Sequence, residues 1–252
     1  MNKKSVLITG STGLAESIIK IYARNNYNII MTYNTHEIEA KALEDEIKNK
    51  YNANVLCIKC DISIEDDIIN LKNKVIEKFG NIDVLINNAS ISIDTTFEEK
   101  TKENFMKILE VNLVGTFLMS KYFGKIMYDN KKGNIINISS TNGIDTYYEY
   151  GLDYDASKAG VINLTHNLAN HYQPYIRVNT VCPGWINTPM NKNMDKEFKK
   201  DEENKILLNR FANPEEIAKV IYFISSDDAS YINDSIIRVD GGKKCWILKI
   251  NI

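Results

Sequence analysis

The sequence predicts an α/β fold in which short parallel strands alternate with helices. Seven short runs rich in β-branched residues recur along the 252-residue chain. Longer stretches with the apolar spacing of amphipathic helices separate these runs. No repeat, low-complexity tract or Pro/Gly-rich linker divides the chain, so we predict a single domain over residues 1–252.

The expected elements follow one another in the order of a doubly wound protein. The expected strands are 5–9, 28–33, 54–59, 84–87, 134–139, 177–181 and 236–239. The expected helices are 15–25, 37–50, 65–78, 102–128, 154–171 and 214–225. Such alternation calls for a parallel sheet, here of about seven strands, with helices on both faces, which is a Rossmann-type arrangement. We expect a cofactor half over about 1–90 and a catalytic and substrate half over about 91–252, with 243–252 as a terminal strand or an arm on a neighbouring subunit.

Composition favours a protein that acts on small molecules. The chain is 44% hydrophobic and 25% charged, with a formal net charge of −2, so it has no basic field to attract nucleic acid or an anionic membrane. No apolar run reaches the roughly 18 residues of a membrane span. The first strand begins too early to leave room for a signal peptide. We therefore expect a cytoplasmic protein with neither nucleic acid nor membrane as a partner.

Cys57 and Cys60 have the C-x-x-C spacing of some redox and zinc sites. They fall in an expected buried strand, where side chains three residues apart point to opposite faces of the sheet. No second ligand pair appears, and the three histidines have no metal-binding spacing. We therefore predict no metal site.

The turn after the first strand contains Gly10 and Gly13 and leads directly into a helix. A glycine turn in this context permits unusual backbone angles and sets a pyrophosphate against the first amides of the helix. Many strand-to-helix turns use glycine for geometry alone, so this turn by itself leaves both interpretations open.

A second group of residues has the pattern of an acid–base centre. Tyr154 and Lys158 are four residues apart at the start of an expected helix, so both project from one face. A nearby cation favours the ionised phenol, which predicts a lowered pKa for Tyr154. The strand 134–139 ends in two neighbouring hydroxyls, those of Ser139 and Ser140, and a hydroxyl at this place can bind a substrate oxygen. The alternatives are a solvated helix face and a strand-end hydroxyl that bonds to the backbone.

In order along the chain, these elements resemble those of the short-chain dehydrogenase/reductase family. The glycine turn is similar to its T-G-x-x-x-G-x-G element, shortened by one residue, and NNAS at 87–90 is similar to N-N-A-G, with Ser90 in the place of the glycine. The P-G pair at 183–184 and D-G-G at 240–242 complete the resemblance. It implies catalysis by Ser140, Tyr154 and Lys158, with Asn112 anchoring a proton-relay water.

The resemblance also implies a nicotinamide cofactor and its contacts. No carboxylate precedes Glu37 after the second strand, which favours NADP (NADPH) over NAD, although no arginine is present there to hold the extra phosphate. Asp61 is one of the cofactor contacts that the resemblance implies, and its other interpretation is that of a helix N-cap. The expected cofactor-binding residues are Gly10, Ser11, Thr12, Gly13, Leu14, Tyr33, Asn34, Thr35, Asp61, Ile62, Asn88, Ala89, Tyr154, Lys158, Pro183, Gly184, Ile186 and Thr188.

Within the family the chain most resembles the 3-oxoacyl-acyl-carrier-protein reductase branch. This implies reduction of a carbonyl to a secondary alcohol, with an acyl-carrier-linked 3-oxoacyl thioester as one candidate substrate, and a homotetramer. The stretch 187–210 has six basic and five acidic residues, which is typical of a solvated lid helix rather than a dock for an acidic carrier. The alternatives are a dehydrogenase of sugars, polyols or other secondary alcohols, and a dinucleotide-binding regulator with little turnover. Tyr147, Tyr148 and Tyr150 either line an aromatic pocket or simply pack.

Overall fold

The computed structural model describes residues 3–191 and 194–242 and contains the expected parallel sheet. Its strand order is β3-β2-β1-β4-β5-β6-β7, and every neighbouring pair is parallel. This confirms the seven-stranded, doubly wound arrangement. The strands are β1 (Ser5–Ile8), β2 (Asn28–Tyr33), β3 (Val55–Lys59), β4 (Val84–Asn87), β5 (Gly133–Ile138), β6 (Ile176–Pro183) and β7 (Ile236–Val239).

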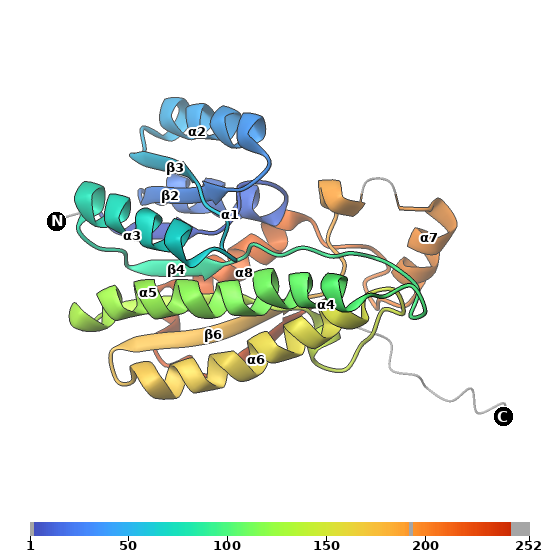
Figure 1. Cartoon of the computed structure of the whole chain (residues 1–252). Helices are drawn as coiled ribbons and strands as arrows, with labels where there is room; N and C mark the ends of the chain where they lie inside the picture. Colours follow the sequence, from blue (N-terminus) through green and yellow to red (C-terminus); the bar gives the residue numbers. More distant parts are fainter. Residues whose placement is uncertain (1–2, 192–193, 243–252) are drawn as a thin grey trace.

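Helices cover both faces of the sheet, as Figure 1 shows. One apolar core joins the sheet to α1, α2 and α8, and a second joins it to α3, α5 and α6. The strands supply both cores by alternation, since Val6 and Ile8 enter the first core while Leu7 enters the second. The helices are α1 (Leu14–Arg24), α2 (Glu37–Tyr51), α3 (Glu65–Phe79), α4 (Lys102–Leu109), α5 (Thr116–Asp129), α6 (Leu152–Tyr172), α7 (Lys196–Asn204) and α8 (Pro214–Ser225).

The same alternation explains the two cysteines of the C-x-x-C pattern. Cys57 lies in the first core and Cys60 in the second, so their side chains are on opposite faces, as predicted. Both are free thiols. Burial raises the pKa of Cys57 to about 11 and that of Cys60 to about 12, which leaves both thiols protonated at neutral pH.

The predicted helix 102–128 is wrong in one respect, because a π-helical turn at Glu110–Gly115 separates α4 from α5. At Gly115 the helix passes so close to the loop after β3 that a Cβ would lie 2.8 Å from the side chain of Ile62. Other differences are small. Helix α6 begins at Leu152 rather than at Tyr154, β6 extends to Pro183, and α7 occupies only part of the predicted lid. The expected terminal strand or arm at 243–252 lies outside the described residues.

The strand order reverses between β1 and β4. A ligand-binding crevice is expected where this reversal meets the carboxyl ends of the strands. In Figure 1, α7 stands apart from the sheet, beyond the end toward which the strands point. In the described ranges, no helix has the length and apolarity needed to cross a membrane.

Candidate active site

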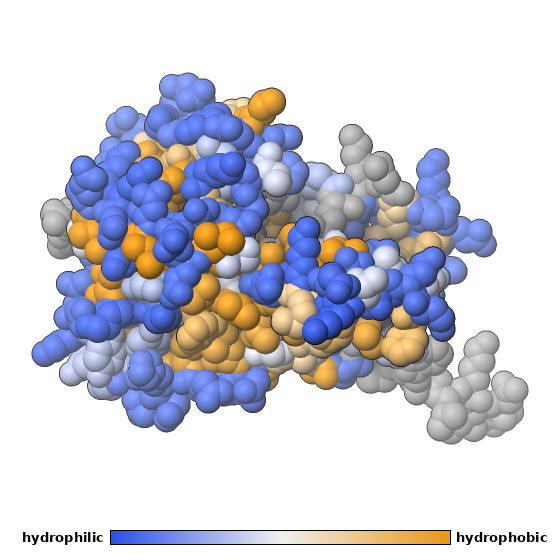
Figure 2. Space-filling model, in the orientation of Figure 1, coloured by the Kyte–Doolittle hydropathy of each residue, from blue (hydrophilic) through white to orange (hydrophobic). Residues whose placement is uncertain are grey.

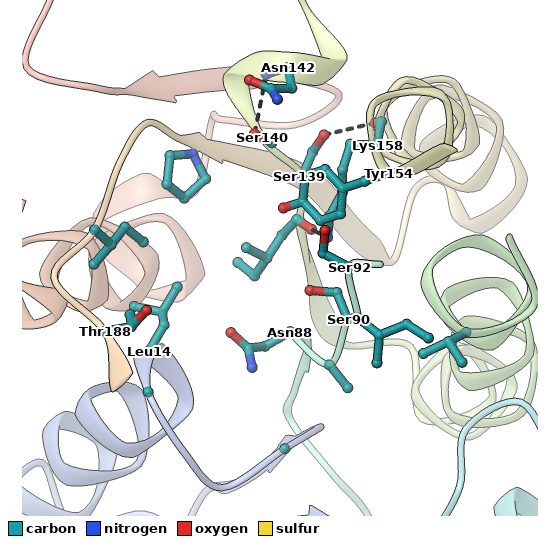
Figure 3. Close-up of a pocket in the computed structure, with 18 of the residues that line it drawn as sticks. Leu14, Asn88, Ser90, Ser92, Ser139, Ser140, Asn142, Tyr154, Lys158 and Thr188 are labelled. Carbon is teal, nitrogen blue, oxygen red and sulfur yellow. Dashed lines mark hydrogen bonds between the residues drawn. The ribbon is translucent and has the colours of Figure 1, made fainter. Parts of the chain in front are cut away.

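A cavity of about 1470 Å³ lies at the carboxyl ends of the strands, with a wall drawn from the loops after β1 to β6. All the residues predicted to bind the cofactor, from Gly10 to Thr188, line this cavity, and so does Ser140. In Figure 3, Leu14 and Thr188 lie together on one side of the cavity. Ser140 and Tyr154 lie together on another. The structure therefore unites the glycine turn and the acid–base group in one site.

The glycine turn has the geometry of a pyrophosphate cradle. Gly10 and Gly13 have φ angles of 91° and 62°, which favour glycine. Gly13 is also the N-cap residue of α1, and no side chain caps the first amides of this helix. Thr9 Oγ1 accepts hydrogen bonds from the backbone amides of Asn88 and Ala89, both at 2.9 Å, which fixes the turn against the loop after β4.

The loop after β3 contributes an acidic group, Asp61, to the cavity wall. Asp61 accepts hydrogen bonds from Asn34 Nδ2 (2.8 Å) and from the amide (2.9 Å) and hydroxyl (2.6 Å) of Ser63. Burial alone would raise the pKa of Asp61, but the bonds from Ser63 and Asn34 outweigh burial and hold this pKa below its usual value. The N-cap interpretation of Asp61 is wrong, because Ile64 occupies that position of α3.

The acid–base group is built by β5 and α6. Tyr154 and Lys158 lie one turn apart on α6, with Lys158 Nζ 5.4 Å from the centre of the tyrosine ring. Lys158 is buried, and its Nζ donates to the carbonyl of Ile138 at 2.9 Å. Ser140 follows β5, hydrogen-bonds to Tyr154, and accepts a hydrogen bond from the amide of Asn142 at 3.2 Å. Figure 3 shows this group facing the cavity.

The structure corrects the expected pKa of Tyr154. Burial raises this pKa to about 12, and the hydrogen bond with Ser140 only partly offsets the effect. Burial also lowers the pKa of Lys158 to about 8, so the cation expected to ionise the phenol is itself destabilised. At neutral pH the phenol of this chain holds its proton.

Asn112 is the one predicted catalytic residue that does not line the cavity. It lies in the π-helical turn, is buried, and uses its side chain to join two other segments. Its Oδ1 accepts from the amide of Ile91 (2.8 Å), while its Nδ2 donates to the carbonyl of Ile91 (3.0 Å) and to Ser157 Oγ (3.0 Å). These bonds connect the loop after β4 to α6, one turn from Tyr154. The predicted relay water remains a prediction.

The substrate side of the cavity contains residues that the motifs did not single out. Trp185 lines the cavity, stacks on Phe211 with ring centres 5.4 Å apart, and donates to Glu202 Oε2 of α7 at 2.8 Å. Tyr148 also lines the cavity and meets Trp185 edge to face at 6.2 Å. Of the other two tyrosines, Tyr147 lines the cavity and Tyr150 packs on Tyr148. In the sequence, the signal for this aromatic wall was the position of Trp185 directly after the P-G pair and of the tyrosines directly before α6.

Comparison with known proteins identifies reductases that are similar to this chain over nearly its whole length. Residues 8–244 match the family model described as Enoyl-(Acyl carrier protein) reductase. The chain is 36% identical to the 3-oxoacyl-[acyl-carrier-protein] reductase FabG of Aquifex aeolicus, over 95% of this chain and 96% of that protein. It is 34% identical to FabG of Thermotoga maritima, over 95% of this chain and 97% of that one.

Solved structures share the fold at similar coverage. Levodione reductase superposes with a TM-score of 0.88 at 31% identity, covering 94% of this chain and 96% of that one. ElxO with NADP bound gives a TM-score of 0.88 at 29% identity, covering 95% and 98%. The fold and these relatives define an NAD(P)-dependent oxidoreductase. The chain belongs to the short-chain dehydrogenase/reductase family.

Proposed function

We propose that this protein uses NADPH to reduce the carbonyl of a 3-oxoacyl thioester to a secondary alcohol. The observation that carries the proposal is the meeting of Ser140, Tyr154 and Lys158 with the glycine turn in one cavity. The thioester is suggested by the two FabG relatives, which match nearly the whole chain.

The cavity fits a dinucleotide on two observations of this chain. The first amides of α1 have no side-chain cap and adjoin Gly13, as a bound pyrophosphate requires. Among the described residues, Lys158 donates to one acceptor, the carbonyl of Ile138, which leaves two of its three protons for a ribose hydroxyl. The nicotinamide, when bound, supplies a hydride to the carbonyl carbon.

The side chains then act on the substrate oxygen. Tyr154 holds a proton at its Oη and passes it to this oxygen, which its raised pKa permits because the phenol is protonated at neutral pH. Ser140 already bonds to Tyr154, so its hydroxyl is close enough to hydrogen-bond the same oxygen as negative charge develops there. Lys158, charged below about pH 8, stabilises the tyrosinate that remains.

NADPH is proposed over NADH from the residues that follow β2. Asn34, Thr35 and His36 line the cavity, and none of these three side chains has a carboxylate. A carboxylate here would bind the ribose hydroxyls of NAD and repel a 2′-phosphate. The structure of ElxO with NADP bound supports the same choice.

A second substrate class is favoured by the aromatic wall. Tyr147, Tyr148 and Trp185 line the substrate side of the cavity. Flat rings of this kind suit a compact, ring-bearing or apolar ketone better than a flexible acyl chain, because aromatic surfaces stack. This candidate is a secondary-alcohol dehydrogenase, and the likeness to levodione reductase is consistent with it.

We also propose a homotetramer, as the family resemblance implies, with interfaces on the helices around Asn112 and Tyr154. In Figure 2 apolar side chains gather around α5. Val114 in the π-helical turn and Phe117 in α5 are each 42% exposed. Light scattering at micromolar protein is expected to give four times the chain mass, and a monomeric mass would overturn the proposal.

The test is consumption of NADPH and of NADH by the wild type and by Tyr154→Phe, with 3-oxoacyl thioesters, cyclic diketones and ketosugars as substrates. Loss of the phenol proton should lower kcat by roughly 10²- to 10⁴-fold, while NADPH binding measured by fluorescence stays within about twofold. Wild-type turnover of cyclic diketones alone would select the second substrate class. Tight NADPH binding without any turnover would favour the dinucleotide-binding regulator instead.

A further inference from the structure

A buried ion pair lies beside the acid–base group. Lys100 Nζ is 3.1 Å from Asp153 Oδ1, and the two side chains are only 5% and 0% exposed. Lys100 comes from the segment between β4 and α4, whereas Asp153 is in the first turn of α6, directly before Tyr154. The pair therefore connects two segments that lie far apart in the sequence.

Each partner makes further bonds at the same junction. The ammonium of Lys100 also donates to the carbonyls of Ile93 (2.6 Å) and Tyr150 (3.4 Å). Asp153 Oδ1 also accepts from the amide of Tyr154 at 2.9 Å. Ile93 belongs to the cavity wall, so the pair links this part of the wall to the backbone of the tyrosine itself.

The pair is poorly explained as a source of stability. Two charges removed from water recover their desolvation cost only when every polar atom is satisfied, and well-packed apolar residues often serve as well. In the described part of the chain, Asp153 Oδ2 is buried without a hydrogen-bond partner, and so is Thr95 Oγ1 in the connected segment. An incompletely bonded pair of this kind favours a role in geometry.

We propose that Lys100 and Asp153 are positioning residues, which fix the separation between the 91–94 wall and Tyr154 so that a bound carbonyl meets the phenol. This inference rests on the proposed reductase function. A shift of about 1 Å in such a separation is enough to cost about 100-fold in rate. Neither residue lines the cavity, so neither touches the substrate or the cofactor directly.

The test compares Lys100→Met, Asp153→Asn and the double variant Lys100→Met/Asp153→Leu. Each single change leaves one buried charge or polar group without its partner, so the Tm should fall. The double change removes both charges, so its Tm should return to near the wild-type value. In the double variant, kcat should still fall at least tenfold, and the isotope effect with deuterated NADPH should rise, because hydride transfer becomes rate-limiting. The dissociation constant for NADPH should stay within twofold.

A matched control removes an ion pair outside the cavity. Lys125 and Asp129 pair on the exposed face of α5, with side chains 70% and 58% exposed, so Lys125→Met/Asp129→Leu should leave kcat unchanged. A double variant of the buried pair that folds and retains wild-type kcat and isotope effect would overturn the proposal. Failure of the wild type to reduce any carbonyl would overturn the proposed function instead. In that case the positioning role is tested by hydrogen exchange. The backbone amides of residues 91–94 should exchange faster in the double variant than in the wild type, and equal exchange would overturn the positioning role.

Discussion

The two sides of the cavity are built in different ways. The cofactor side consists of short loops that directly follow strands, with glycine, small polar side chains and free helix amides. The substrate side consists of longer segments, the 141–151 loop, Trp185 and α7, held together by ring contacts. We therefore expect cofactor binding to depend on sheet topology, and substrate preference to depend on packing between distant segments. Substitutions on the substrate side should leave the dissociation constant for NADPH unchanged, and substitutions on the cofactor side should leave the KM of the substrate unchanged.

Among substitutions that should affect only one side of the cavity, the largest effect is expected from a negative charge added on the cofactor side, which should weaken NADPH binding. Thr35→Asp places a carboxylate after β2, where it would face the 2′-phosphate of NADPH. Repulsion of about 2 kcal/mol would weaken NADPH binding on the order of 30-fold. NADH binding and the KM of the substrate should change little. Fluorescence titration with both cofactors measures this, with Thr35→Asn as the uncharged control, and unaltered NADPH binding would place the phosphate elsewhere.

A smaller effect is expected from the backbone of the glycine turn. Gly13 has φ 62° and ψ −122°, so Gly13→Ala should cost about 1–3 kcal/mol of strain and weaken NADPH binding about tenfold. Gly80 is a matched control, because its φ is 73° and an added Cβ there would contact nothing within 4 Å. Gly80→Ala should lower the Tm without altering NADPH binding. Equal binding by both variants would show that the turn does not hold the pyrophosphate.

Lys158 lies where the two sides meet and predicts a pH dependence. Because burial lowers the pKa of Lys158 to about 8, its ammonium is present below that pH and lost above it. The value of kcat/KM for NADPH should therefore fall by up to about tenfold per pH unit above 8. Lys158→Arg keeps its charge over this range and should remove the decline. A wild-type profile that is flat to pH 10 would contradict the prediction.

The same pKa predicts an opposite trend for stability. The folded pKa of Lys158 lies below its ordinary value of 10.5, so the unfolded chain binds more protons between about pH 8 and 10.5. The contribution of Lys158 to the free energy of unfolding therefore rises with pH over this window. Urea unfolding measures the free energy of unfolding of the wild type and of Lys158→Met. The wild type should gain stability relative to Lys158→Met as the pH rises from about 8 to 10.5.

The smallest effect is expected at the aromatic wall. Trp185→Leu removes the stack on Phe211 and the bond to Glu202. Loss of about 1 kcal/mol of aromatic contact should raise the substrate KM about fivefold, with NADPH binding unchanged. Phe223→Leu, on an exposed residue of α8 outside the cavity, is the control. A change in NADPH binding by Trp185→Leu would show that the two sides are not independent.

The sequence predicted those parts of the candidate site whose residues lie close together in the chain. The glycine turn, the Tyr154–Lys158 spacing and the strand before Ser140 each follow from local patterns, and the structure brings them into one cavity. The contacts of Trp185 with α7 and the pairing of Lys100 with Asp153 join segments from 17 to 53 residues apart, so no local pattern contains them. The direction of the Tyr154 pKa was missed because spacing does not report burial, which raises this pKa more than the hydrogen bond with Ser140 lowers it.

The π-helical turn at Glu110–Gly115 joins α4 and α5 and lets these two consecutive helices direct different faces toward the rest of the protein. Before the turn, Met106 and Lys107 of α4 line the cavity. After the turn, Met119 and Phe123 are buried in the core beneath the sheet. An extra residue in a helix rotates everything beyond it by about 100°. Deleting one residue there would rotate α5 relative to α4, so that either Met119 and Phe123 leave the core or the side chains of α4 leave the cavity wall. The extra residue of the π-helical turn therefore allows both segments to keep their contacts.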